Sequence, residues 1–303
     1  MRAPNSVRRI HIDPATFDPS KLQAFTHALA DHPLLELDAL VELGRRQQQR
    51  ALIRTHSIEA TASTDFDGAP SLHPNQVGTS AIIENIANAR AWMLLRNVHA
   101  DPIYGRFVDE LFDEVRPAIE PRDPGMYYRA GWIFVSSPGA VTPFHIDRDS
   151  NFLMQIRGTK RLYTWAPDDR VVVSEQAHEQ FHTRQSRELV TWREEFRARA
   201  QIFELEPGRG CYMPSLAPHM VETGPEPSIT ISLTYYTDAT RRRELLHRGN
   251  VRLRQLGLAP QPVGASPRND RIKATVLSGY VSAHNLVRRA LGQPVKRNDP
   301  PYA

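Results

Sequence analysis

Three residues carry side chains from which a metal centre could be built. His145 and Asp147 stand two positions apart in a segment that reads as extended chain. Because side chains at positions i and i+2 of a strand share a face, both could contact one ion. His219 lies more than seventy residues later, after two prolines, and would arrive from another strand. Two histidines and one carboxylate leave coordination positions open, which non-haem Fe(II) oxygenases need for a 2-oxo acid and O₂.

The tripeptide His-Xaa-Asp is a weak signal when it stands alone. The same pattern occurs at His11–Asp13, near the start of the chain. We interpret that copy as incidental, because Pro14 follows it directly and no strand-like segments surround it. The case for His145 and Asp147 therefore depends on the sequence around them.

A second motif offers a different chemistry. His178, Glu179 and His182 fit the pattern H-E-x-x-H, in which two histidines on one helical face bind zinc and the glutamate acts as a base. The segment is short and polar, and Thr183 and Arg184 follow at once, which favours an exposed helix. We expect His178 and His182, and likewise His247 further on, to lie on the surface. A zinc metallopeptidase remains an alternative.

The elements that must position these residues fall into three regions. Residues 1–120 read as mainly helical, residues 121–238 as short strands separated by turns, and residues 239–303 as helical again. Short strands with such turns predict a β-sandwich or small barrel. Helices are expected over residues 21–32, 37–46, 81–91, 103–119, 176–198, 239–256 and 271–291, and strands over residues 92–98, 127–137, 151–156, 160–166, 170–175, 202–205, 211–214 and 228–237.

Several spacings around His145 agree with those of one family. They are Thr142-Pro143-Phe144-His145-Ile146-Asp147, Asn151-Phe152, Gln155-Ile156-Arg157-Gly158-Thr159-Lys160-Arg161, Pro167-Asp168, Pro214 five residues before His219, and the apolar strand at residues 229–234. Residues 125–240 thereby resemble the cupin-like jumonji-C oxygenases that depend on Fe(II) and 2-oxoglutarate. In motif they resemble most the branch that contains the asparaginyl hydroxylase of hypoxia-inducible factor.

The resemblance implies a fold, an activity and a set of site residues. The fold would be a mainly β double-stranded β-helix (jelly-roll or cupin) with an N-terminal helical region and C-terminal helices. The activity would be hydroxylation of an amino-acid side chain in a protein, peptide or small molecule, coupled to decarboxylation of 2-oxoglutarate by O₂. His145, Asp147 and His219 would hold Fe(II). The implied contacts to 2-oxoglutarate are Lys160, Thr142, Asn151, Tyr128 and Thr234, the last standing where the hydroxylase has asparagine.

Composition and charge limit the kinds of metal site, cellular location and partner that the protein can have. The single Cys211 excludes an internal disulfide and a cysteine cluster, so a metal would need nitrogen and oxygen ligands. No apolar run is long enough for a membrane span and no secretory signal follows the basic start, so we expect a cytoplasmic protein. The net charge is +4, and the late arginines favour a solvated helix face, which makes nucleic acid an unexpected partner.

Two further hypotheses concern partners. Apolar positions on the C-terminal helices are compatible with a homodimer formed through them, as in the asparaginyl hydroxylase. A non-catalytic cupin-like barrel that binds a ligand or DNA as a regulator is the other alternative, because a fold does not determine a function. Succinate formation would distinguish the oxygenase from both alternatives.

Overall fold

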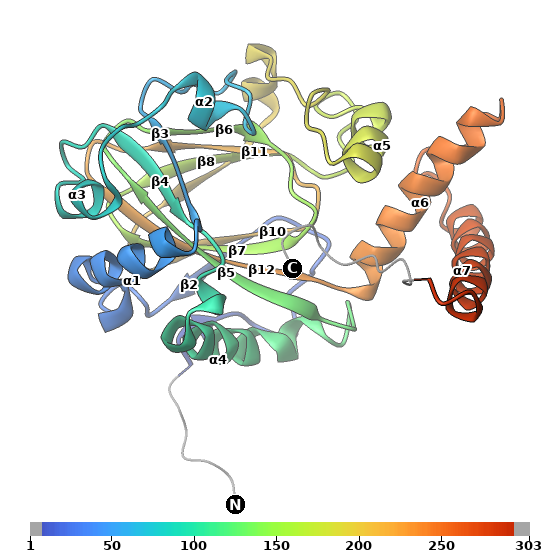
Figure 1. Cartoon of the computed structure of the whole chain (residues 1–303), viewed down its shortest axis with the longest axis horizontal. Helices are drawn as coiled ribbons and strands as arrows, with labels where there is room; N and C mark the ends of the chain where they lie inside the picture. Colours follow the sequence, from blue (N-terminus) through green and yellow to red (C-terminus); the bar gives the residue numbers. More distant parts are fainter. Residues whose placement is uncertain (1–7, 294–303) are drawn as a thin grey trace, which may run out of the picture.

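Two antiparallel sheets face one another in the computed structural model, which describes residues 8–293 (Figure 1). The larger sheet has the strand order β1-β2-β10-β7-β12-β5-β4-β3, and the smaller has the order β6-β11-β8-β9. The core strands are β5 (Tyr127–Ser136), β6 (Val141–His145), β7 (Ser150–Arg157), β8 (Lys160–Thr164), β9 (Gln201–Leu205), β10 (Arg209–Met213), β11 (His219–Thr223) and β12 (Ser228–Tyr236). The predicted mainly β, jelly-roll core with flanking helices is confirmed.

The N-terminal part of the chain adds strands to the larger sheet as well as helices. These strands are β1 (Ile10–His11), β2 (Gln23–His27), β3 (Ile53–Ser57) and β4 (Ala91–Leu95). The expected helix over residues 21–32 is wrong, because β2 lies there and pairs with β10. Phe25 and His27 are buried while Thr26 between them is exposed, so this segment follows the two-residue period of a strand. Pairing with distant backbone overrides its local helical pattern.

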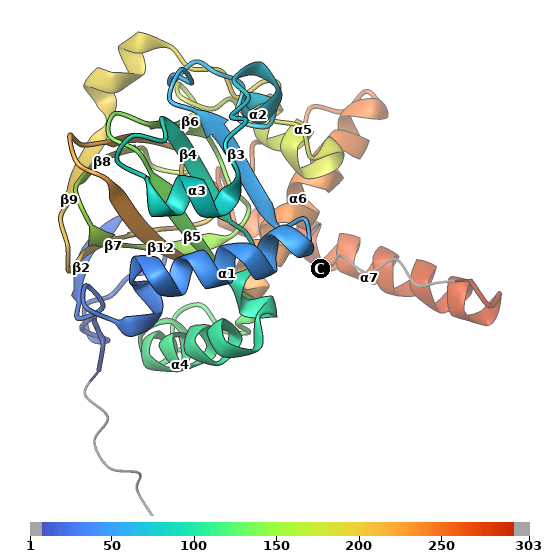
Figure 2. The same cartoon turned by 60° about the vertical axis from the view of Figure 1, so that its left-hand side comes forward.

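Helices cover the outer face of the larger sheet (Figure 2). They are α1 (Leu37–Gln49), α3 (Thr79–Glu84) and α4 (Pro102–Ile119), while the short helix α2 (Ala69–Leu72) lies in the connection between β3 and α3. Leu40 of α1 and Leu111 of α4 share one hydrophobic core with Ile231 of β12. The helices predicted from residues 37 and 103 are confirmed, and Asp101 caps α4 by accepting bonds from the backbone N–H groups of Ile103 and Tyr104.

The C-terminal helices project from the barrel in both ribbon views. α5 (Glu175–Arg184) lies beside the barrel, α6 (Asp238–Gln255) packs on α5, and α7 (Pro267–Ala290) packs on α6. The segment predicted as the strand 170–175 forms turns that lead into α5 instead. The three short 3₁₀ helices are η1 (Pro33–Leu35), η2 (Val98–Ala100) and η3 (Glu194–Arg199). Among residues 8–293, none of the helices combines the length and apolarity that crossing a bilayer requires.

Candidate active site

The register of the smaller sheet brings the three predicted ligands together. His145 ends β6 and His219 begins β11, and these two residues stand directly opposite each other in the antiparallel pair. Asp147 follows β6 by two residues. Its Oδ2 atom lies 3.4 Å from His145 Nε2 and 3.8 Å from His219 Nε2. One ligand atom from each of the three residues lies within 4.8 Å of the others, so the predicted convergence is present.

Backbone carbonyls orient both imidazoles. His145 Nδ1 donates to the carbonyl of Pro143 at 2.8 Å, and His219 Nδ1 donates to that of Ala217 at 3.0 Å. Because a carbonyl can only accept, Nδ1 of each ring carries a proton, and Nε2 is the atom directed toward the metal position. Burial lowers the pKa of His219 to about 4, which keeps its ring neutral at physiological pH. Neutral imidazole is the form that binds metal ions.

The two oxygens of Asp147 have different surroundings. Oδ2 faces the imidazoles, whereas Oδ1 accepts a bond from Arg187 Nη2 at 2.8 Å. Burial alone would raise the pKa of Asp147, but His145 and Arg187 beside it hold that pKa well below its usual range. The carboxylate is therefore ionised. A carboxylate with two imidazoles is the donor set that suits Fe(II) and leaves positions open for other ligands.

A cavity of about 260 Å³ opens beside these three residues. Both sheets contribute to its wall, and so do the connection between β3 and α3 and the chain that follows α5. The lining residues are Arg54, Phe66, Asp67, Leu94, Arg96, Trp132, Phe134, Thr142, His145, Asp147, Arg148, Asp149, Asn151, Leu153, Lys160, Phe181, Gln185, Arg187, Met213, His219, Val221, Ser232, Thr234 and Tyr236. The wall combines apolar and aromatic side chains with a few charged groups, as small-molecule sites do.

Lys160 is a buried cation in this cavity. It begins β8, and only 4% of the residue is exposed. Its Nζ atom lies 5.5 Å from the centre of the Phe134 ring, and in the described part of the chain it forms no ion pair or hydrogen bond. Burial lowers the pKa of Lys160 to about 7. An ammonium group placed in such a site needs an anion to offset its loss of solvent.

The other predicted contacts divide into those that reach the cavity and one that does not. Thr142, Asn151 and Thr234 line it, but Tyr128 does not. Tyr128 is the second residue of β5 and has a left-handed backbone at φ 49°. Its ring packs against Tyr236, and it is Tyr236 that lines the cavity. The expectation that Tyr128 lines the pocket is therefore wrong.

Hydrogen bonds already in place limit what these polar groups can do. Trp92 Nε1 donates to Thr142 Oγ1 at 2.8 Å, so the hydroxyl proton of Thr142 stays available to an acceptor in the cavity. Trp132 Nε1 makes the same kind of bond to Thr234, at 2.8 Å. Thr142 and Thr234 therefore each accept a bond from an indole N–H. Burial raises the pKa of Asp149, which also lines the cavity, to about 7.

Sequence reasoning missed the residues that surround the ligands. Phe66 stacks on His145 with ring centres 3.8 Å apart and an angle of 8°. Asp67 accepts from Arg187, which also bonds Asp147. Phe66 and Asp67 lie in a turn-rich connection and Arg187 follows α5, so no local period or motif marks them. Only the three-dimensional fold brings them to the metal ligands.

The second motif does not form a zinc site. His178, His182 and His247 are 0%, 2% and 1% exposed, so the prediction that they lie on the surface is wrong. Their rings stack, with His247 at 5.6 Å from His178 and 4.8 Å from His182. Glu179 pairs with Arg254 at 3.1 Å. Among the described residues, only the group around His145 places three ligand atoms close enough to share an ion.

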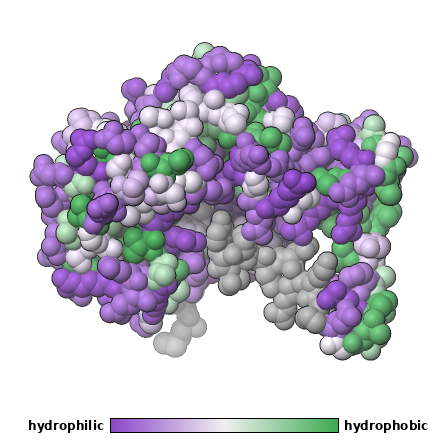
Figure 3. Space-filling view, turned by 45° about the horizontal axis from the view of Figure 1, so that its top comes forward, coloured by the Kyte–Doolittle hydropathy of each residue, from purple (hydrophilic) through white to green (hydrophobic). Residues whose placement is uncertain are grey.

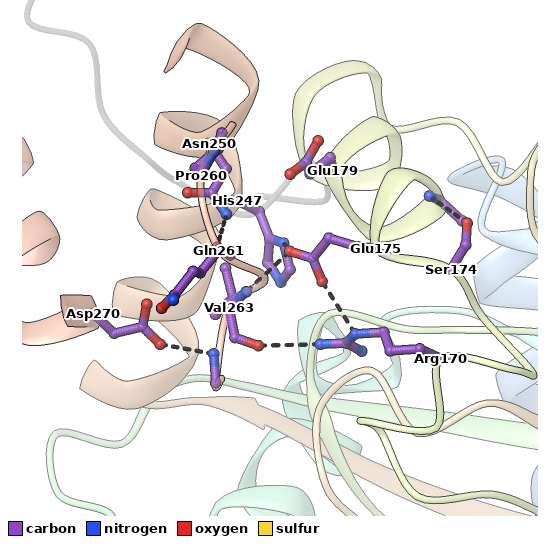
Figure 4. Close-up of polar contacts among 12 residues, drawn as sticks. Arg170, Ser174, Glu175, Glu179, His247, Asn250, Pro260, Gln261, Val263 and Asp270 are labelled. Carbon is purple, nitrogen blue, oxygen red and sulfur yellow. Dashed lines mark hydrogen bonds and ion pairs between the residues drawn. The ribbon is translucent and has the colours of Figure 1, made fainter. Parts of the chain in front are cut away.

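These buried histidines instead lie where α5 packs on α6, and Figure 4 shows His247 of α6 beside Glu175 of α5. His247 Nδ1 lies 3.3 Å from Glu175, which also pairs with Arg170 and accepts from the backbone N–H of Val263. Both ring nitrogens of His178 have no hydrogen-bond partner within the described part of the chain. The helix was wrongly expected to be exposed because its polar residues face α6 rather than water.

Comparison with known proteins identifies the family. The model of the cupin-like domain matches residues 69–241, more than half of the chain. The chain belongs to this cupin-like domain family. The match contains all of the strands from β4 to β12, and with them the three ligands. It agrees with the predicted cupin-like, jumonji-C relationship, whereas closeness to the asparaginyl hydroxylase branch stays a prediction.

Solved structures of low identity also match the chain. A structure of Escherichia coli YcfD is 18% identical with a TM-score of 0.36, and the match covers 63% of this chain and 48% of that one. A structure of YcfD, described as a ribosomal oxygenase, in complex with cobalt and 2-oxoglutarate is 18% identical with a TM-score of 0.35, and the match covers 63% of this chain and 47% of that one. The DMSP lyase DddQ from Ruegeria pomeroyi is 15% identical with a TM-score of 0.24, and the match covers 36% of this chain and 38% of that one. The match spans about half the length of YcfD. No curated protein matches the sequence.

Proposed function

We propose that the protein is an Fe(II)- and 2-oxoglutarate-dependent oxygenase that hydroxylates an amino-acid side chain. The observation that carries the proposal is that one cavity holds both the His145, Asp147 and His219 group and the ammonium of Lys160, which has no ion-pair partner within residues 8–293. The two histidines and the carboxylate would bind a metal ion and leave some of its coordination positions open, and the ammonium of Lys160 requires an anion. A 2-oxo dicarboxylate satisfies both requirements at once, because one end can chelate a metal while the other carries a carboxylate.

The residues of the chain have separate tasks in this proposal. His145, Asp147 and His219 would hold Fe(II), which supplies O₂ activation and oxidation of a C–H bond when it is bound. Lys160 would pair with the far carboxylate of 2-oxoglutarate, and Thr142 would donate its uncommitted hydroxyl proton to that carboxylate. The apolar side chains of the cavity would limit the access of water to the reacting groups.

Metal and cofactor binding can be tested without knowledge of the substrate. Anaerobic addition of Fe(II) and 2-oxoglutarate is expected to produce a visible metal-to-ligand charge-transfer band. Asp147→Ala should abolish the band by removing a metal ligand. Lys160→Ala should leave metal binding intact and raise the 2-oxoglutarate concentration needed for the band. If both variants gave the wild-type titration, the assignment would be wrong.

The substrate class is proposed from the resemblance and from the size of the cavity. A space of about 260 Å³, shared with 2-oxoglutarate, admits one side chain rather than a large cofactor. We propose a free amino acid, a peptide or a protein side chain as the hydroxylated group. Succinate release above the uncoupled background, measured against a panel of amino acids and peptides, tests this. Metal and 2-oxoglutarate binding with no succinate from any preparation would favour a binding protein instead.

We also propose that the C-terminal helices pair two copies of the chain. α7 exposes a series of large apolar side chains, and apolar surface gathers on the C-terminal helices at the right of Figure 3. Val276 and Leu286 of α7 are 65% and 69% exposed, and Leu291, which caps the end of the helix, is 66% exposed. Apolar surface of this kind is typical of a protein interface. Val276→Glu combined with Leu286→Glu is expected to shift a dimer to a monomer in sedimentation equilibrium, whereas a monomeric wild-type protein would refute the proposal.

A further inference from the structure

We infer that Arg187 is a positioning residue for the metal centre. It restricts Asp147 to one metal-facing oxygen, and it joins that carboxylate to the segment carrying Phe66 and Asp67, which covers His145. The inference rests on the proposed metal centre and adds to it a residue that no part of the ligand motif contains.

The guanidinium of Arg187 is held from three directions. Its Nε atom donates to the carbonyl of Ile146 at 2.8 Å, and Nη2 donates to Asp147 Oδ1 at 2.8 Å. Its Nη1 atom lies 2.9 and 3.2 Å from the two carboxylate oxygens of Asp67. Only 8% of Arg187 is exposed. A planar group that uses all three nitrogens in different directions has one orientation, which a lysine cannot reproduce.

This orientation separates the two oxygens of Asp147. Oδ1 is occupied by Arg187, so Oδ2 is the atom that faces His145 Nε2 at 3.4 Å and His219 Nε2 at 3.8 Å. Coordination through one oxygen gives three protein ligand atoms, which leaves three positions of a six-coordinate ion open. Coordination through both oxygens would occupy one of the positions that a bidentate 2-oxo acid and O₂ require.

Arg187 also contacts the β3–α3 connection, whose Phe66 ring lies over His145. Phe66 stacks on His145 with ring centres 3.8 Å apart. The guanidinium carbon of Arg187 lies 5.1 Å from the centre of the Phe66 ring and 4.8 Å from that of Phe181. Arg187 therefore lies between the aromatic ring of the β3–α3 connection and that of α5. Asp67, which is about half exposed, adds the ionic contact that directs this connection toward the site.

Metal affinity and the spectrum of bound Co(II) test the positioning role directly. Co(II) is titrated into the metal-free full-length protein, and the dissociation constant and the intensity of the visible d–d bands are recorded. We expect Arg187→Gln to weaken Co(II) binding by about 10- to 100-fold, the usual effect of losing a partner of a ligand, and to change the band intensity, which reports coordination number. Arg187→Lys, which keeps the charge but loses the directed bonds, should recover only part of the affinity.

Two further variants separate the contact between Arg187 and Asp67 from the contact between Arg187 and the metal ligand Asp147. Asp67→Asn is expected to weaken Co(II) binding less than Arg187→Gln does, and to speed amide hydrogen exchange in residues 59–68. The matched control is Arg161→Gln, which breaks an exposed pair with Glu204 on the outside of β8 and should leave both readouts unchanged. Circular dichroism verifies that each variant is folded.

The outcomes distinguish this inference from the proposed function. Folded Arg187→Gln and Arg187→Lys with wild-type Co(II) affinity and spectrum would overturn the positioning role. Wild-type Co(II) binding that does not respond to 2-oxoglutarate would overturn the proposed function but leave the role of Arg187 in place. No Co(II) binding by the wild-type protein would overturn both.

Discussion

Replacing Lys160 with methionine is expected to make the protein more stable while it removes 2-oxoglutarate binding. Methionine fills a similar volume with an apolar side chain that adapts to its surroundings. The reason for the stabilisation is that the ammonium of Lys160 is buried in the described structure without an anionic partner. A residue whose only role was packing would behave in the opposite way, because its loss would destabilise the fold.

The magnitude follows from the pKa of Lys160. Burial lowers it from 10.5 to about 7, and each pKa unit corresponds to about 1.4 kcal/mol. At pH 7 the buried position of the lysine therefore costs roughly 4 kcal/mol of unfolding free energy. Between pH 7 and 10.5 the unfolded chain binds the proton more tightly than the folded chain, so stability rises with pH in this range. The gain from Lys160→Met should be largest below pH 7 and disappear above about pH 10.5.

Urea denaturation in the presence and absence of ligand measures both effects. The wild-type protein should gain roughly 3 kcal/mol from Mn(II) and 2-oxoglutarate when the latter is at a hundred times its dissociation constant. Lys160→Met should gain stability without ligand and respond to Mn(II) alone. Lys21→Met, at an exposed lysine, is the control and should shift the free energy of unfolding by less than about 0.5 kcal/mol.

The reasoning is refuted by one combination of results. If Lys160→Met were less stable than the wild-type protein and still gained the same stability from 2-oxoglutarate, the lysine would be neither a strained cation nor a ligand for the cofactor. A stabilised variant that retained 2-oxoglutarate binding would overturn the cofactor assignment alone.

Three further predictions concern the scaffold. Burial lowers the pKa of His178 from 6.5 to about 3, so below about pH 6.5 the unfolded chain takes up a proton that the folded chain does not. The free energy of unfolding should therefore fall as the pH is lowered, and this residue should account for a loss of about 2 kcal/mol at pH 5. Urea titrations at about pH 6.5 and about pH 5 measure the difference. Gly158→Ala should cost more than about 2 kcal/mol and weaken 2-oxoglutarate binding, because φ is 65° there and a Cβ would meet the Pro227 carbonyl at 2.3 Å. Asp101→Ala should cost about 2 kcal/mol in the same assay, because it removes the cap of α4 and the partner of Arg46.

The sequence by itself determined the local features of this protein. The helical pattern of residues 103–119 predicted α4, and short strand-like segments separated by turns predicted the strands of the barrel core. The pair His145 and Asp147 was predicted from spacing alone, because side chains two positions apart in extended chain share a face, although the strand itself ends at His145 and Asp147 follows it. The spacing of Pro214 and His219 added the third ligand only through resemblance to a family.

Tertiary structure decided what depends on distant partners. The strand β2 (Gln23–His27) exists because β10 pairs with it, and its own sequence favoured a helix. His178 is buried because α6 covers α5, and nothing in a polar helical segment indicates which neighbour will face it. Arg187 reaches Asp147 across a separation of forty residues. Burial, pKa and hydrogen-bond partners are properties of surroundings assembled from several segments, so they were fixed only when the sheets and helices packed together.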